Sequence, residues 1–209
     1  MENKYNAQTG TLYVVRTDEC PEDPHTDLSV WGFVFFHKRH DLPNDLDVRS
    51  GDFNGWDELE AYIRERRGET TEIEPVYMYD HSGTAFSRSL TCPWDSGQVG
   101  FAYRVPSDTP DLTREKALEY LDEELEEYTN YANGNVLELV VTEKGEDPEY
   151  STFYTEKALK AYLEAEVPGY VEALPLKTAS VDDPGLKLLA RAFIEEKGLM
   201  PEYLKWLTE

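Results

Sequence analysis

The stretch YMYDHSGTAFSRSLTCPWDSGQVGFAYR, residues 77–104, is the most informative part of this chain for its fold. It contains two strand-like runs, and glycines at positions 83, 97 and 100 mark turns or bulges. Runs of β-branched and aromatic residues separated by such turns are typical of antiparallel pairing. We therefore expect residues 77–104 to form a tightly turned hairpin that anchors a sheet.

Outward from this block, strands are expected where β-branched and aromatic residues gather, and helices where apolar residues recur every three or four positions. The expected strands are Thr11–Arg16, Val30–Phe36, Glu74–Tyr79, Ala85–Ser89, Val99–Val105, Val136–Thr142 and Ser151–Tyr154. The expected helices are Trp56–Arg67, ending at Gly68, then Arg114–Ala132, capped by Asp111 or Thr113 and closing at Asn133-Gly134, and Glu156–Val167.

Hairpin-like links, rather than regular βαβ units, indicate an α+β fold with a mixed, mainly antiparallel sheet and amphipathic helices on it. We expect residues 1–167 to form this α+β domain. Two shorter helical patterns, 184–198 and 201–207, predict a small helical C-terminal extension over residues 168–209.

The chain is strongly acidic. Among its 209 residues, 43 Asp and Glu outnumber 20 Lys and Arg, which gives a formal net charge of -23. No segment matches the spacing of a calcium loop, and ten lysines with many aromatics do not favour adaptation to salt. A third explanation is a surface that resembles the phosphate backbone of DNA, which carries one charge per about 1.7 Å of axis; the alternative is a solvated acidic face that serves solubility alone. A DNA-like surface predicts a basic protein partner and excludes direct binding to nucleic acid or to an anionic membrane.

The longest apolar run, Val30–Phe36, is too short to cross a bilayer, and the first residues do not resemble a signal peptide. We therefore expect a cytoplasmic protein in which Cys20 and Cys92 stay reduced.

The acidic excess is densest on the expected helix Arg114–Ala132, although carboxylates also crowd residues 18–27 and 41–47. Like charges four residues apart oppose helix formation, so their retention suggests a use. The candidate partner-binding residues are Glu115, Glu119, Asp122, Glu123, Glu126 and Glu127.

Two strings within the opening block, YDHSG at 79–83 and CPWDSGQVGF at 92–101, resemble a signature of an uncharacterised protein family encoded by phages and mobile elements, mainly of Gram-positive bacteria. The resemblance extends from about Val34 to Asn133. It implies a phage-like or plasmid-like origin and supplies no activity.

The same block holds residue types suited to cysteine-dependent chemistry. A nucleophilic thiolate needs a base and an orienting carboxylate, and Cys92, His81 and Asp95, with Asp80 nearby, are of the right types. The alternative is structural: residues 80–83 form an Asx-type turn, and Cys92 packs at the edge of the core.

Cys20, His25, His37 and His40 are the residues best suited to zinc, but their spacing matches no familiar ligand pattern. We therefore expect no metal and no cofactor.

These observations predict a non-enzymatic accessory protein that binds and inhibits a basic, nucleic-acid-binding host defence protein of restriction or CRISPR type, by DNA mimicry. One alternative is a hydrolase or transferase that uses Cys92 and His81. Another is a structural protein that self-associates, for example as a homodimer, through exposed aromatics such as Trp31, Trp94 or Trp206.

Overall fold

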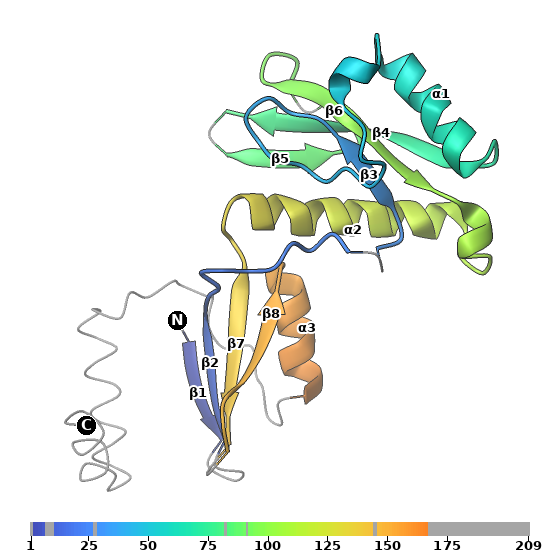
Figure 1. The fold of residues 1–209 in the computed structure, drawn as a ribbon. Helices are drawn as coiled ribbons and strands as arrows, with labels where there is room; N and C mark the ends of the chain where they lie inside the picture. Colours follow the sequence, from blue (N-terminus) through green and yellow to red (C-terminus); the bar gives the residue numbers. More distant parts are fainter. Residues whose placement is uncertain are drawn as a thin grey trace, which may run out of the picture. The chain divides into compact units, whose positions relative to one another are not determined.

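The computed structural model describes residues 2–6, 11–26, 29–81, 83–90, 92–143 and 146–166, and these residues form two compact units (Figure 1). Of the described residues, unit 1 contains 2–6, 11–17, 137–143, 146–152 and 159–166. Unit 2 contains Asp18–Val136 and Phe153–Ala158. The expected C-terminal extension, 168–209, lies outside the described residues.

Unit 1 is built on a four-stranded antiparallel sheet in the order β1-β2-β7-β8. Its strands are β1 (Glu2–Asn6), β2 (Thr11–Thr17), β7 (Leu137–Thr142) and β8 (Glu149–Phe153). Helix α3 (Glu156–Glu166) adds Leu159 and Leu163 to the buried residues of this unit.

Unit 2 contains the second four-stranded antiparallel sheet, in the order β3-β6-β4-β5. The strands are β3 (Gly32–Phe35), β4 (Glu72–Asp80), β5 (Thr84–Ser87) and β6 (Ser96–Arg104). Strands β4 and β5 form the expected hairpin, and β6 lies between β3 and β4. The block 77–104 therefore holds the centre of this sheet.

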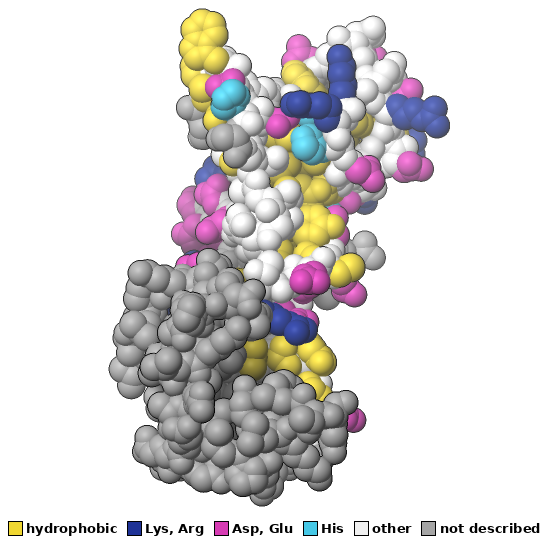
Figure 2. All heavy atoms as spheres, turned by 90° about the vertical axis from the view of Figure 1, so that its left-hand side faces the viewer, with side chains coloured by type: hydrophobic (Ala, Val, Ile, Leu, Met, Phe, Trp, Pro, Cys, Tyr) yellow, Lys and Arg dark blue, Asp and Glu magenta, His cyan; other side chains and the backbone are white. Residues whose placement is uncertain are grey.

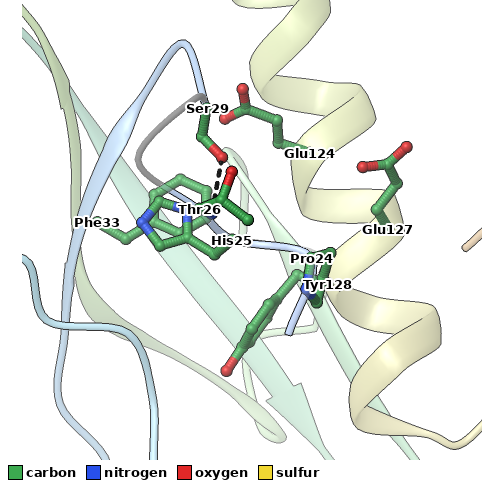
Figure 3. A pocket seen from close by; sticks show the side chains of 8 residues that line it. All are labelled: Pro24, His25, Thr26, Ser29, Phe33, Glu124, Glu127 and Tyr128. Carbon is green, nitrogen blue, oxygen red and sulfur yellow. Dashed lines mark hydrogen bonds between the residues drawn. The ribbon is translucent and has the colours of Figure 1, made fainter. Parts of the chain in front are cut away.

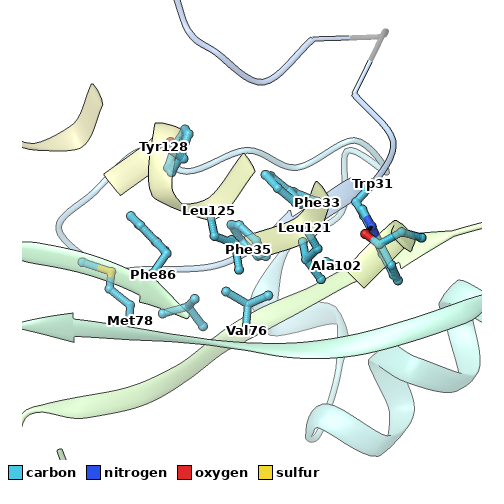
Figure 4. Packing of buried hydrophobic residues seen from close by; sticks show 12 residues of the cluster. Trp31, Phe33, Phe35, Val76, Met78, Phe86, Ala102, Leu121, Leu125 and Tyr128 are labelled. Atoms are coloured by element: carbon cyan, nitrogen blue, oxygen red, sulfur yellow. Dashed lines mark hydrogen bonds between the residues drawn. The ribbon is translucent and has the colours of Figure 1, made fainter. Parts of the chain in front are cut away.

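Helices cover the two faces of this sheet. The face toward α2 (Arg114–Ala132) buries Phe33 and Phe35 of β3 against Leu121 and Leu125 (Figure 4). The opposite face buries Val34 with residues of α1 (Trp56–Arg67). This separation follows from the strand period of two, which sends successive side chains to opposite faces.

A β-bulge in β6 alters that period. Val76 of β4 pairs with Gly100, whereas the next residue, Tyr77, pairs with Gln98, so Val99 is an extra residue. As a result Val99 and Ala102 share the face toward α2, although they are three positions apart.

The fold class and the main helix boundaries are confirmed. Thr113 caps α2 by accepting a hydrogen bond from the backbone N–H of Lys116, and the N–H of Gly68 donates to the Arg64 carbonyl (2.7 Å) at the end of α1. Short 3-10 turns, Ser50–Asp52 and Pro106–Asp108, precede the two helices.

Three features differ from expectation. The strands divide between two sheets, and β1 forms from the polar segment ENKYN, which carries no strand signal of its own and is ordered by pairing with β2. Trp31 was expected to be exposed, which is wrong: its side chain is fully buried, and its indole N–H donates to the Ala117 carbonyl at 2.7 Å.

None of the described helices is long and apolar enough to cross a membrane.

Candidate functional site

Helix α2 carries all six candidate partner-binding residues, and the structure places five of them on its exposed side. Glu115, Glu119, Asp122, Glu123 and Glu126 are exposed, whereas Glu127 is partly buried. The buried stripe that fixes this orientation consists of Ala117, Leu121, Leu125 and Tyr128.

The N-terminal half of α2 is largely balanced by cations. Lys116 pairs with Glu119 (2.6 Å), and Arg88 of the loop after β5 forms two hydrogen bonds with the Asp122 carboxylate (2.7 and 2.6 Å). Arg114 pairs with Glu74 of β4. The carboxylates of Glu119 and Asp122 are therefore each paired with a neighbouring cation.

The C-terminal half of α2 lies among carboxylates from separate parts of the sequence. The loop after β2 runs beside it, and the Tyr154 hydroxyl donates to the Glu22 carbonyl of that loop (3.0 Å). We call the carboxylates that act electrostatically on Glu127, Tyr128 and Tyr154, together with Glu127 itself, the acidic surface; it comprises Asp18, Glu22, Asp23, Asp41, Glu123, Glu126 and Glu127.

The electrostatic coupling of these groups shows how close they are. Burial raises the pKa of the Glu127 carboxyl, and the charges of Glu123 and Glu126 raise it further. Burial likewise raises the pKa of the Tyr154 hydroxyl, with additional contributions from loop carboxylates and Glu127. Residues that are more than 100 positions apart in the sequence thus share one negative field.

The face of unit 2 drawn in Figure 2 shows Asp and Glu side chains in several separate groups, with hydrophobic side chains between them. Lys157 pairs with Glu123 (3.0 Å) within the acidic surface.

Beside the acidic surface lies a hollow of about 220 Å³ (Figure 3). Glu124 and Glu127 project into it from α2, and the loop residues on the other side include His25 and Ser29. The complete lining consists of Pro24, His25, Thr26, Ser29, Phe33, Glu124, Glu127 and Tyr128.

Glu124 is the most perturbed carboxyl of this hollow. Burial raises its pKa to about 7, although its Oε1 accepts the backbone N–H of Val30 at 2.7 Å and the nearby His25 acts in the opposite direction. Its Oε2 is buried without a hydrogen-bond partner. At neutral pH this carboxyl therefore exchanges between its protonated and ionised forms.

His25 supplies the second unpartnered atom. Its ring stacks on Phe33 at 4.2 Å between centroids, and its Nε2 lies 3.0 and 3.1 Å from the two carboxylate oxygens of Asp45. Its side chain is only 9% exposed, and Nδ1 is buried without a partner. Within the described residues, His25 Nδ1 and Glu124 Oε2 are the two buried side-chain atoms left unpaired, and both residues line the same hollow.

The residues of the alternative cysteine chemistry also come together, but in a different order. The Cys92 thiol lies 3.6 Å from Asp95, and Asp95 lies 3.9 Å from Nδ1 of His81. Asp95 therefore stands between the thiol and the imidazole, whereas a thiol nucleophile needs the imidazole beside it. His81 is largely exposed.

The four residues considered for zinc do not come together in one cluster. His25 lines the hollow and Cys20 is exposed, while His37 and His40 lie together at the end of β4, next to Asp80. Burial lowers the pKa of His37, and the neighbouring His40 lowers it further against the opposing effect of Asp80. Both cysteines are free thiols.

Sequence reasoning missed the hollow. Position 124 follows Leu121 by three and precedes Tyr128 by four, so the helical period places Glu124 at the margin of the buried stripe. The sequence therefore contained a signal for a partly buried Glu124, although not for the hollow itself. No local pattern pairs His25 with Asp45, because their contact depends on the path of the loop.

Comparisons with protein-family models, with curated proteins and with solved structures find no match to this chain.

Proposed function

We propose that this chain is a non-enzymatic accessory protein of a phage or mobile element that acts in the host cytoplasm. It binds a basic, nucleic-acid-binding host protein of a restriction or CRISPR type and inhibits it by occupying the site of DNA. The observation that carries this proposal is the convergence of carboxylates from two loops and from α2 on the acidic surface.

The carboxylates of the acidic surface suit a groove of the partner that normally binds phosphates. Complementary charges accelerate encounter, and exposed pairs lose most of their attraction as salt rises, since the screening length falls from about 8 Å at 0.15 M to about 3 Å at 1 M. The separate carboxylate groups can occupy phosphate sites, while the apolar side chains between them add contact area.

The hollow gives this surface an anchor point for one Lys or Arg side chain of the partner. A guanidinium or ammonium group entering it can donate to both Glu124 Oε2 and His25 Nδ1, the two buried atoms without partners. A cation there stabilises the ionised form of Glu124, so binding below about pH 7 releases a proton.

The test is capture of partners from a lysate of a Gram-positive host. We compare the wild-type chain with a variant in which three exposed residues of the acidic surface, Glu22, Glu123 and Glu126, are replaced by Lys. The matched control carries the same change of charge at Asp57, Glu65 and Glu69, which are exposed on or just after α1.

We expect the wild type and the control to retain a nucleic-acid-binding protein at low salt and to release it at high salt, and the acidic-surface variant to lose it. Equal loss in the two variants would mean that only net charge matters. Retention by the acidic-surface variant would remove this surface as the contact site.

Self-association remains a second candidate function because Trp94 is 92% exposed and Leu90 is also exposed. Trp94→Ala should abolish any dimer seen by light scattering if this candidate is correct. The cysteine-dependent alternative is weaker, since Asp95 rather than His81 contacts the thiol.

A further inference from the structure

A second cluster of chemically reactive side chains, none of them counted in the acidic surface, lies at the end of β4. His37 and His40 belong to the loop after β3, and Asp80 is the last residue of β4. Their ligand atoms all lie within 4.8 Å of one another. The histidine rings face each other at 4.8 Å between centroids. Figure 2 shows histidine side chains at the surface of unit 2, next to acidic and basic ones.

We propose that His37, His40 and Asp80 bind a divalent transition-metal ion such as Zn²⁺ through two imidazole nitrogens and one carboxylate oxygen. Imidazole with carboxylate suits zinc, cobalt and nickel better than magnesium or calcium, which prefer oxygen ligands alone. Within the described residues, no other three His, Cys, Asp or Glu side chains form such a group.

The distances fit this assignment. In a tetrahedral zinc site with bonds of about 2.0–2.1 Å, neighbouring ligand atoms are about 3.3 Å apart. The Nε2 atoms of His40 and His37 lie 3.6 and 3.8 Å from Asp80 Oδ2. Small rotations of exposed or partly buried side chains therefore complete the arrangement, with the remaining coordination positions open to water or to a partner group.

Arg39 competes with the metal for this carboxylate. Its guanidinium is hydrogen-bonded to Asp80 Oδ2, and its side chain is 70% exposed, so it can leave at low cost. Its backbone N–H donates to His37 Nδ1 at 3.3 Å. A metal on Nε2 requires the imidazole proton on Nδ1, so the backbone hydrogen bond to Nδ1 is lost when the metal binds. Because the Arg39 guanidinium occupies Asp80 Oδ2, removing the guanidinium should strengthen metal binding.

The position of Asp80 is fixed by the sheet. Its backbone N–H donates to the Asp95 carbonyl (3.1 Å), and its backbone pairs with Thr84 of β5. A bound ion would tie the loop after β3 to this fixed point. Asp80 is part of the YDHSG string, and the proposed site gives that string a chemical role.

The test is calorimetric titration of the tag-free full chain with ZnCl₂, together with the visible absorption of added Co²⁺. We expect one ion per chain, and weakening by about tenfold or more in His37→Gln, His40→Gln and Asp80→Asn. The control His81→Gln, adjacent in sequence and outside the cluster, should bind as the wild type does. Circular dichroism establishes that each variant is folded.

Arg39→Gln gives a result that misfolding cannot imitate, because it should bind Zn²⁺ more tightly than the wild type. Absence of binding by the wild type, unchanged binding by Asp80→Asn, or weaker binding by folded Arg39→Gln would each overturn the proposal.

Discussion

The buried carboxyl of Glu124 links the stability of the fold to the proposed binding of a cation. Its Oε1 accepts the backbone N–H of Val30, whereas its Oε2 is buried without a partner, as is Nδ1 of His25, which lines the same hollow. A carboxyl in this environment is costly to ionise while the hollow is empty. The same environment favours entry of a cation, because both unpaired atoms then gain a donor.

The raised pKa of Glu124 predicts a pH dependence of stability. An acid whose pKa is raised from 4.5 to about 7 on folding stabilises the fold below pH 4.5 and loses that contribution as pH rises to 7. The loss amounts to about 3 kcal/mol at most. Glu124→Gln should therefore be more stable than the wild type at pH 8, with the difference shrinking toward pH 4.

Urea denaturation of both proteins between pH 4 and pH 8 measures this difference. A stability difference that does not change with pH would contradict the perturbed state of Glu124.

Gly100 predicts a second effect at the scale of single residues. A Cβ atom at this position would lie 1.9 Å from the Val34 carbonyl oxygen and 3.0 Å from the Phe35 Cα, which are backbone atoms of the neighbouring strand. Gly100→Ala should destabilise the protein by about 1–3 kcal/mol or more. Gly97→Ala, in the same strand with no atom within 4 Å of its Cβ, should stay within about 0.5 kcal/mol of the wild type. Thermal denaturation compares them, and equal behaviour would contradict the close approach of β3 and β6.

At the scale of elements, α2 protects the outer edge of β5. The Asn133 side chain accepts from the Thr84 N–H (2.9 Å) and donates to the Thr84 carbonyl (2.6 Å), as a paired strand would. Thr129 accepts the next outward N–H, that of Phe86, at 3.0 Å. An edge strand that is covered in this way cannot recruit another chain.

Asn133→Ala should remove these contacts and cost about 0.5–1.5 kcal/mol, because the hydrogen bonds to the Thr84 backbone are lost. Hydrogen exchange of the Thr84 amide should accelerate more than exchange in the centre of β6. Asn130→Ala, one turn earlier on α2, is the matched control and should change neither quantity. Unaltered exchange at Thr84 in Asn133→Ala would show that α2 does not protect this edge.

The elements themselves could largely be predicted from sequence, whereas their partners could not. The apolar period of α2 and its Thr113 cap are local signals, and both are confirmed. The pairing of Val14 with Val140 joins residues more than 120 positions apart, and no local pattern encodes it. The division into two sheets therefore emerges only with the structure. The hollow, and the contact of His37 and His40 with Asp80, likewise could not be predicted from local sequence patterns.

At the scale of the whole chain, the net charge of -23 was evident from composition, but its distribution was not. The sequence indicated that the acidic excess is densest on α2. Cations balance its N-terminal half, and loop carboxylates join its C-terminal half. The proposed recognition surface therefore depends on how the charged side chains are arranged, and not on the total charge of the chain.

The most direct measurement is competition between this protein and DNA for the captured host partner, followed by fluorescence anisotropy of labelled DNA. Wild-type protein should displace the DNA completely, less effectively as salt rises, and the variant with Lys at positions 22, 123 and 126 should fail to displace it. A ternary complex of DNA, partner and wild-type protein, or equal displacement by that variant, would contradict occupation of a DNA site by the acidic surface.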